Sequence, residues 1–132
     1  MVLSASIMGI DIYARWNGQT EADESTQFES ALSSDGSIGY LREAYHGEPY
    51  ATTFLFREAF ESKTASAPIR ASVLRERLPE ALRLAETRER KIYGAKKPAH
   101  IEPVLQCFRD FVSLCERKEK QTGSPVTIVA SY

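Results

Sequence analysis

The chain lacks the common sequence signatures of a catalytic or metal-binding site. It has no GxxxxGKS/T or GxGxxG loop for phosphates, no HExxH zinc motif, no GxSxG elbow and no cysteine or histidine pairs at ligand spacing. Its 132 residues include only two cysteines and two histidines. These absences argue against P-loop nucleotide hydrolysis, zinc chemistry and α/β-hydrolase chemistry, and we expect no cofactor and no metal.

Long apolar runs and disulfide-forming cysteine patterns are absent too. No run approaches the roughly 18 apolar residues of a membrane-spanning helix, and the N-terminal MVLSASIMGI lacks the basic and apolar regions of a signal peptide. Cys107 and Cys115 fall on one expected helix, where their Cα atoms would be about 12 Å apart, too far for a disulfide. We expect a cytoplasmic protein with two buried, reduced thiols.

The composition is that of an ordinary globular protein, with an uneven charge distribution. A hydrophobic fraction of 42% and a charged fraction of 27% suit one folded domain over residues 1–132. Residues 1–66 carry four basic and ten acidic side chains, and residues 67–132 carry thirteen and eight, so the net charges are −6 and +5. A nucleic-acid surface is one interpretation of the basic half. Its basic residues lie among glutamates on expected helices, however, so we interpret them, including the run from Arg88 to Lys91, as solvated helix faces.

Alternating apolar and polar residues predict strands near both ends of the chain, at residues 9–16 and 126–132. The β-branched and aromatic stretch YATTFLF at residues 50–56 predicts another strand. A fourth, short edge strand is expected at residues 68–71, where the missing donor of Pro68 does least harm.

Helical spacing and capping residues predict helices at residues 20–30, 58–62, 72–94 and 101–122. We expect Ser72 to cap the third helix, and Pro79 either to kink that helix or to divide it in two. The last helix has apolar residues at the i, i+3, i+4 and i+7 positions and is expected to end at Gly123.

These elements predict an α/β (α+β) fold, a two-layer sandwich in which a small mixed sheet has helices packed on one face. The first strand is apolar on one face only, so Asp11, Tyr13 and Arg15 project from the uncovered face. We expect that face to be wet unless the acidic segment or another copy of the protein covers it.

Residues 39–50, GYLREAYHGEPY, concentrate polar and aromatic side chains. Arg42 is a candidate clamp for a carboxylate or phosphate, and His46 is a candidate acid or base near neutral pH. Tyr40 and Tyr45 would add hydrogen bonds or stacking surface. Residues 40–46 are interpreted as a short helix, with a strand over the first half as the alternative, and aromatic anchoring in the core is the structural explanation of the cluster.

The second constellation, Asp11, Tyr13 and Arg15, also has two interpretations. These residues are either solvent-facing, with Asp11 and Arg15 forming a surface pair worth well under ~1 kcal/mol, or part of a pocket with Arg42 and His46. The candidate ligand-binding residues are therefore Asp11, Tyr13, Arg15, Tyr40, Arg42, Tyr45 and His46.

The stretches MGIDIYARW, GYLREAYHGEPYAT, RERLPEALRLAETRERKIYG and VTIVASY resemble small, uncharacterised bacterial proteins over nearly the whole chain. The resemblance implies a bacterial single-domain protein, and it implies no activity or cofactor. The leading hypothesis is a non-catalytic binding or assembly module, a homo-oligomer that contacts a partner or a small anionic ligand. The alternatives are a cofactor-free enzyme using His46 and Arg42, and nucleic-acid binding through the basic half.

Overall fold

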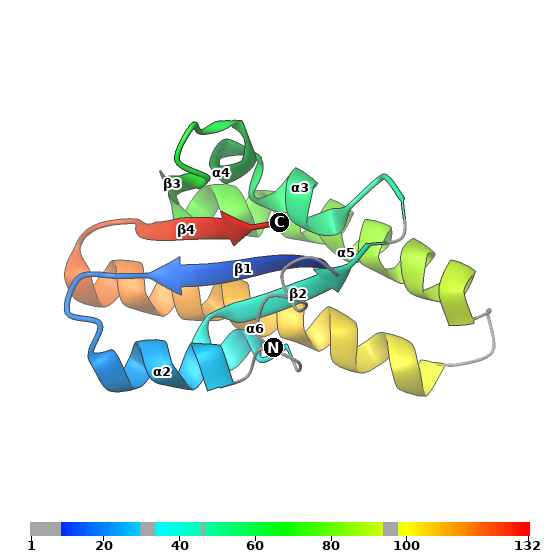
Figure 1. Ribbon diagram of the computed structural model, residues 1–132, viewed down its shortest axis with the longest axis horizontal. Helices are drawn as coiled ribbons and strands as arrows, with labels where there is room; N and C mark the ends of the chain where they lie inside the picture. The colour runs from blue at the N-terminus through cyan, green and yellow to red at the C-terminus, as the bar shows by residue number, and fades with distance from the viewer. Residues whose placement is uncertain (1–8, 30–33, 46, 94–97) are drawn as a thin grey trace.

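Four strands form one antiparallel sheet in the order β2-β1-β4-β3 (Figure 1). The structure is a computed structural model and describes residues 9–29, 34–45, 47–93 and 98–132. The strands are β1 (Gly9–Arg15), β2 (Tyr40–Ala44), β3 (Ser66–Ile69) and β4 (Val126–Ser131). All three pairings are antiparallel, so this sheet is not mixed.

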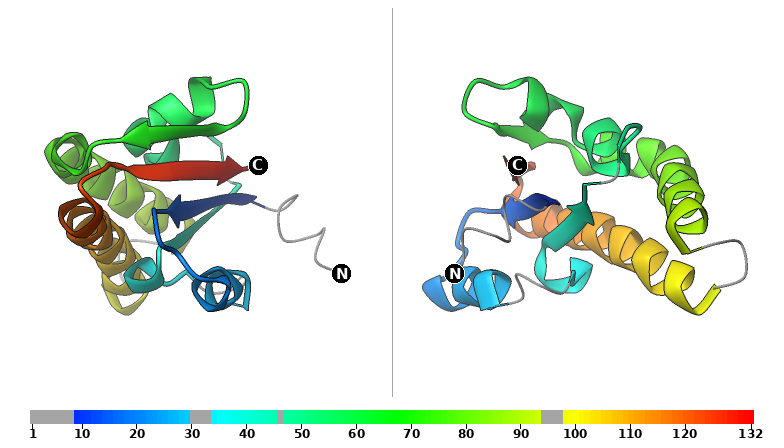
Figure 2. Two further views of the ribbon diagram at one scale, coloured as in Figure 1. Left: turned by 90° about the vertical axis from the view of Figure 1, so that its left-hand side faces the viewer. Right: turned by 45° about the vertical axis from the view of Figure 1, so that its right-hand side comes forward.

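Two long helices and several short ones pack around this sheet. The described helices are α2 (Glu21–Glu29), the 3-10 turn η1 (Gly36–Ile38), α3 (Ala51–Leu55), α4 (Arg57–Glu61), α5 (Ala71–Tyr93) and α6 (Pro98–Thr122). The long helices α5 and α6 lie on the same face of the sheet (Figure 2). This arrangement confirms the predicted two-layer α+β fold.

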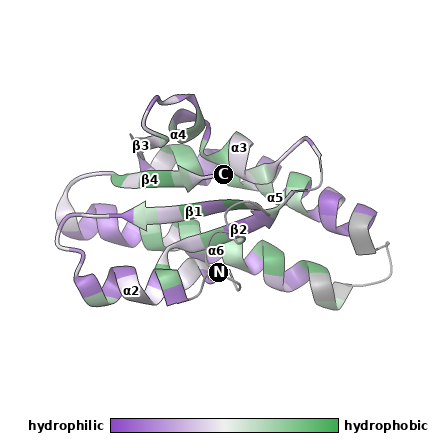
Figure 3. Cartoon of the chain, in the orientation of Figure 1, coloured by the Kyte–Doolittle hydropathy of each residue, from purple (hydrophilic) through white to green (hydrophobic). Residues whose placement is uncertain are grey.

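One apolar core joins the two layers. The strands contribute Ile12, Leu41 and Ile128, and the long helices contribute Leu74 and Phe111, all at most 2% exposed. Figure 3 shows apolar residues along β4 and a mixture of apolar and polar residues along α5 and α6, as expected for elements with one buried side. No helix among the described residues combines the length and the apolar character that crossing a bilayer requires.

Two predicted elements are wrong. Residues 50–56 do not form a strand, because Ala51–Leu55 is the helix α3. The segment interpreted as a helix contains the strand β2, Tyr40–Ala44, which is the alternative that the sequence left open. The left-handed residue Gly39, at φ +83°, is the C-cap of η1 and directly precedes β2.

The long helices differ from prediction in detail. Pro79 lies inside α5 without dividing it, and the helix begins at Ala71, so Ser72 is not its N-cap. The backbone N–H of Ala71 instead donates to Glu119 Oε1 at 2.9 Å, a side chain of α6. Helix α6 ends as predicted at Gly123, whose φ is +77° and whose N–H donates to the carbonyl of Glu119.

Both outer edges of the sheet are blocked. Along β2, Ser34 Oγ accepts from the backbone N–H of Arg42 at 2.8 Å, and Asp35 forms a bridge with Tyr40. The opposite edge strand, β3, is four residues long and contains Pro68. Neither edge therefore offers a long row of free backbone groups for another strand.

The two thiols differ in burial. Cys115 is buried at 1% exposure, as predicted, whereas Cys107 is only partly buried. Both are free. Burial raises the pKa of both thiols, so both are protonated near neutral pH and poorly nucleophilic.

Candidate functional site

The pairing of β1 with β2 brings four of the predicted site residues together. Asp11 lies opposite Arg42, and Tyr13 lies opposite Tyr40. Their neighbours Ile12 and Leu41 are in the core, so alternation turns Asp11, Tyr13, Tyr40 and Arg42 to the sheet face away from α5 and α6. His46 lies outside the described residues.

Asp11 is the centre of this cluster, on the face that the sequence predicted to be wet unless the acidic segment or another copy of the protein covered it. Its side chain accepts from Arg42 Nη1 at 2.8 Å and 3.0 Å, one bond to each carboxylate oxygen. Oδ1 also accepts from the Tyr40 hydroxyl at 2.6 Å. Asp11 is only 3% exposed. The expected surface pair between Asp11 and Arg15 is thus replaced by a buried bond from the neighbouring strand.

Arg15 turns toward α2 rather than toward Asp11. Its guanidinium donates to Gln27 and lies 5.2 Å from the centroid of the Tyr13 ring and 5.9 Å from that of Phe28. The Tyr13 ring in turn stacks on Tyr40, with centroids 5.2 Å apart. The face therefore carries an aromatic and cationic layer whose members already contact one another.

The cluster of Asp11, Tyr13, Tyr40 and Arg42 is explained as a structural network, in which the donors and acceptors bond to one another. Burial, followed by the hydrogen bond to Asp11, raises the pKa of Tyr40 far above its ordinary value. Burial also raises the pKa of Tyr13. Burial alone would lower the pKa of Arg42, but its hydrogen bonds to Asp11 outweigh that effect and raise it. All three keep their ordinary protonation at neutral pH, and Tyr45 does not join them because it follows β2 and is 47% exposed.

A second polar cluster, which the sequence reasoning missed, lies on the other face of the sheet. Glu43 is 1% exposed. Its Oε2 accepts from the N–H of Ala51 at 3.0 Å, and its Oε1 accepts from the N–H and the hydroxyl of Thr52 at 2.9 Å and 2.5 Å. The carboxylate therefore satisfies orphan donors in the first turn of α3.

Arg88 and Glu89 complete this buried cluster. The run of charges from Arg88 to Lys91 was predicted to be solvated, but the side chains of Arg88 and Glu89 are 9% and 6% exposed. Arg88 donates to Glu89 through Nε and Nη2, and its Nη1 lies 3.2 Å from Glu43 Oε2. Only the second half of the run faces water, with Lys91 exposed.

The sequence did contain a signal for this cluster. On α5 the fully buried Ala81 is followed at i+4 by the fully buried Ala85. Arg88 and Glu89 follow Ala85 at i+3 and i+4, which places both charges near the same helix face. In a strand, Glu43 shares the face of Leu41. Reading β2 as a strand and extending the α5 stripe would have brought the three residues together.

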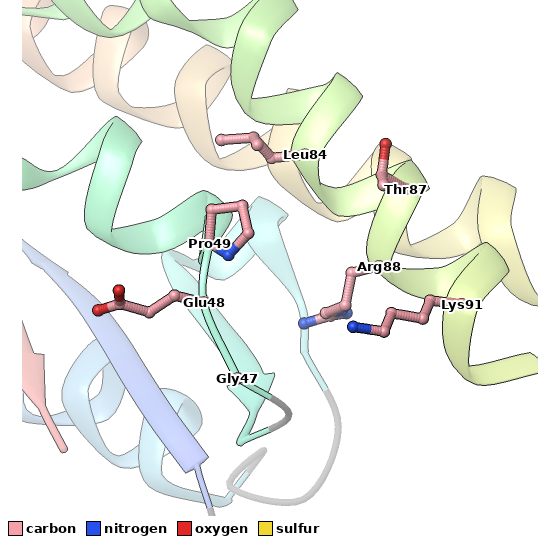
Figure 4. A pocket seen from close by; sticks show the side chains of 7 residues that line it. All are labelled: Gly47, Glu48, Pro49, Leu84, Thr87, Arg88 and Lys91. Carbon is pink, nitrogen blue, oxygen red and sulfur yellow. The ribbon is translucent and has the colours of Figure 1, made fainter.

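Arg88 lines two cavities. The first has a volume of about 120 Å³ and lies between α5 and the residues that precede α3, where Gly47, Pro49, Leu84 and Lys91 help to enclose it. Figure 4 shows Arg88 and Lys91 extending from α5 toward Gly47, whereas the carboxylate of Glu48 points away from them. The second cavity, of about 230 Å³, lies between β2 and α6.

Arg88 also has unused hydrogen-bonding capacity. A guanidinium carries five N–H donors, and Nε and Nη2 are occupied by Glu89. Nη1 is buried and has no hydrogen-bond acceptor among the described residues, because its approach to Glu43 lacks hydrogen-bond geometry. A buried donor without an acceptor is costly, and here it belongs to a residue that lines both cavities.

Comparison with models of protein families, with curated proteins and with solved structures gives no match to this chain. Within the described ranges, no three histidine, cysteine, aspartate or glutamate side chains converge in a way that would hold a metal ion. The chemistry of the site therefore has to be argued from the two clusters and the cavities beside them.

Proposed function

We propose that this protein is a non-catalytic binding module for a small anionic ligand, held at the cavity wall formed by Arg88 and Lys91. One observation carries the proposal. The buried Nη1 of Arg88 has no hydrogen-bond acceptor among the described residues, although Arg88 lines two cavities. A carboxylate or phosphate oxygen would supply that acceptor in a charge-assisted bond.

Two cationic side chains on the cavity wall, Arg88 and Lys91, are the groups that would contact an anion. The charge of Glu43 is shared with three donors of α3, and Glu89 is offset by Arg88. Lys91 lines the first cavity and makes no ion pair with the described residues. Its ammonium group is therefore a second positive group at the cavity wall, beside the guanidinium of Arg88.

The other two classes have less support. As an enzyme, the chain would use Arg42 as an anion clamp, but its Nη1 already binds both oxygens of Asp11. As a nucleic-acid binder, it would need free basic side chains in the C-terminal half. Seven arginines there form ion pairs with glutamates: Arg70, Arg75, Arg77, Arg83, Arg88, Arg90 and Arg109.

A thermal unfolding titration tests the proposal with sodium phosphate and sodium acetate, at ionic strength matched with sodium chloride. At ten times the Kd, a ligand that binds only the folded state stabilises it by about 1.4 kcal/mol, or roughly 4–7 °C in Tm for a chain of this size. Lys91→Glu should abolish the shift. The matched control is Lys120→Glu, an exposed lysine on α6, which should keep it.

The outcomes separate specific binding from general salt effects. Equal shifts in wild type and in both variants would show that the anions act away from this cavity. If neither anion raises the Tm at concentrations up to the high millimolar range, the proposal is refuted.

A homo-oligomer formed through exposed aromatic side chains is the second candidate. Phe28 and Tyr132 are 57% and 59% exposed, and they contact Tyr13 and Phe60 with ring centroids 5.5 Å and 5.0 Å apart. Exposed aromatic residues of this kind are typical of contact surfaces. Because both sheet edges are blocked, we expect pairing through these side chains rather than by strand addition.

Light scattering coupled to size exclusion tests this candidate. We expect a dimer whose dissociation constant rises at least tenfold in Phe28→Ser, while Tyr45→Ser, a second exposed aromatic residue, serves as the control. A concentration-independent mass of 14.8 kDa would exclude the oligomer.

A further inference from the structure

We infer that the ligand is an amphipathic carboxylate, with its head group at Arg88 and an apolar tail of about six to eight carbons between β2 and α6. This inference rests on the proposed anion site and adds the identity of the tail. It comes from the second cavity, which differs in chemistry from the first although Arg88 lines both.

The second cavity is lined mainly by apolar side chains. Leu41 of β2 and Phe108 of α6 form its buried part, at 2% and 3% exposure. Val104 and Cys107 line it on α6, and burial raises the pKa of the Cys107 thiol, so that side chain is a neutral, weakly polar surface. A hydrocarbon chain fits such a lining, whereas a phosphate or a sugar would leave polar groups without partners.

Arg88 makes one end of this cavity cationic, so the two ends of the cavity differ in chemistry. The lining is apolar along α6, cationic where the guanidinium of Arg88 reaches it from α5, and partly polar on the β2 side, where Ser34 and Arg42 also line it. A planar guanidinium matches the two oxygens of a carboxylate in geometry. A ligand with one carboxylate at one end of an apolar chain would therefore meet the guanidinium with its head group and the apolar side chains of α6 and Leu41 with its tail.

The size of the cavity limits the tail. At about 30 Å³ for each water molecule, a volume of about 230 Å³ corresponds to roughly seven or eight water-sized groups. A methylene group is similar in size, so the tail should stop gaining contacts at about eight carbons. Long-chain fatty acids would have to leave part of the chain in water.

The test is an NMR titration of the 132-residue chain with sodium acetate, butyrate, hexanoate, octanoate and dodecanoate, together with octan-1-ol and sodium phosphate. Affinity should rise roughly fourfold for each added methylene up to about eight carbons and then level off. Octan-1-ol should bind at least tenfold more weakly than octanoate, because it lacks the charged head.

Two variants locate the tail. Val104→Phe fills the cavity, and we expect it to weaken octanoate binding at least tenfold while acetate binding is unchanged. Val73→Phe, a similarly half-buried valine on α5 that does not line this cavity, is the matched control and should bind octanoate normally. If Val104→Phe fails to fold, the chain-length series on the unmodified protein still decides the question.

The titration gives different results if the tail hypothesis is wrong and if the anion-site hypothesis is wrong. Equal affinities for acetate and octanoate would overturn the inference and leave the anion site standing. Equal affinities for octanoate and octan-1-ol would also overturn it, because the head group would then contribute nothing. No saturable binding of any anion, phosphate included, would refute the proposed function itself.

Discussion

Glu43 provides the most direct test of the buried cluster, because one substitution removes its charge without changing its size. In Glu43→Gln, one carboxylate oxygen becomes an amide group. That amide cannot accept from the N–H of Ala51 or Thr52, and the buried Arg88 loses the nearby charge of its partner. The fold should survive, since β2 still pairs with β1 and Leu41 still fills the core.

The expected loss follows from burial. Removing one partner of a buried ion pair costs about 3–5 kcal/mol, since the other charge stays behind without compensation. The loss of a hydrogen bond to a charged acceptor, about 1.5–3 kcal/mol, is part of that figure rather than an addition to it. Because Arg88 keeps its bonds to Glu89, we expect a value near the lower end, about 3 kcal/mol.

The assay is urea unfolding followed by circular dichroism, with the slope m compared between variants to check that the unfolding transition is unchanged. Glu58→Gln is a matched control, because Glu58 also pairs with an arginine of α5, at 2.6 Å from Arg77. Its side chain is 38% exposed, so the loss should be under about 1 kcal/mol. Similar small losses in both variants would refute the reasoning that burial decides the cost.

Three further predictions use other parts of the fold. Tyr40→Phe removes the hydroxyl that donates to the buried Asp11 and should cost about 1.5–3 kcal/mol in urea unfolding; a loss below about 0.5 kcal/mol would contradict the assigned bond. Gly36→Ala should destabilise severely, because a Cβ there would lie 2.0 Å from the backbone oxygen of Cys107; normal thermal unfolding of this variant would contradict the close approach. Hydrogen bonds from Arg77 lower the pKa of the Glu58 carboxyl in the folded state. The Glu58 carboxylate therefore contributes its full stability above the unfolded pKa of about 4.3, and this contribution is lost as the pH falls through the lower folded pKa. The difference in unfolding free energy between wild type and Glu58→Gln should therefore disappear in acid, and a difference that grew below pH 4 would be the wrong sign.

The elements with strong periodicity were predictable from the sequence. The alternation of β1 and β4 and the apolar stripe of α6 arise from burial on one side of each element, and burial leaves a pattern in the residues themselves. Pro68 and Gly123 were also assigned correctly, because each has a backbone property that does not depend on distant contacts.

The two wrong elements depend on contacts with residues far away in the chain. Nothing within Ala51–Leu55 caps that helix; its first N–H groups donate to Glu43 on β2. Local propensity favours a strand for this β-branched, aromatic stretch, and the tertiary cap overrides that preference. Likewise, β2 becomes a strand through pairing with β1 on one side and contacts to Ser34 and Asp35 on the other.

The candidate site was predictable only in part. The hypothesis that Asp11 meets Arg42 agrees with the β1–β2 register, but the sequence could not show that their bond is buried or that Arg15 turns to α2. Burial of a charged residue depends on partners from other elements, and charge runs are normally solvated. That general rule is why Arg88 was assigned to solvent.

The two buried charge clusters obey the same physics and differ in what surrounds them. Asp11 accepts hydrogen bonds from both Arg42 and the Tyr40 hydroxyl. Fold stability and strand register are enough to explain this network. The cluster around Arg88 leaves Nη1 without a hydrogen-bond acceptor among the described residues, beside two cavities. Apolar side chains of similar volume commonly serve folding as well as a buried ion pair does. Arg88 offsets the buried charges of Glu43 and Glu89, so part of its role is structural. Folding alone does not explain why its Nη1 lacks a hydrogen-bond acceptor among the described residues, and a bound anion would supply that acceptor.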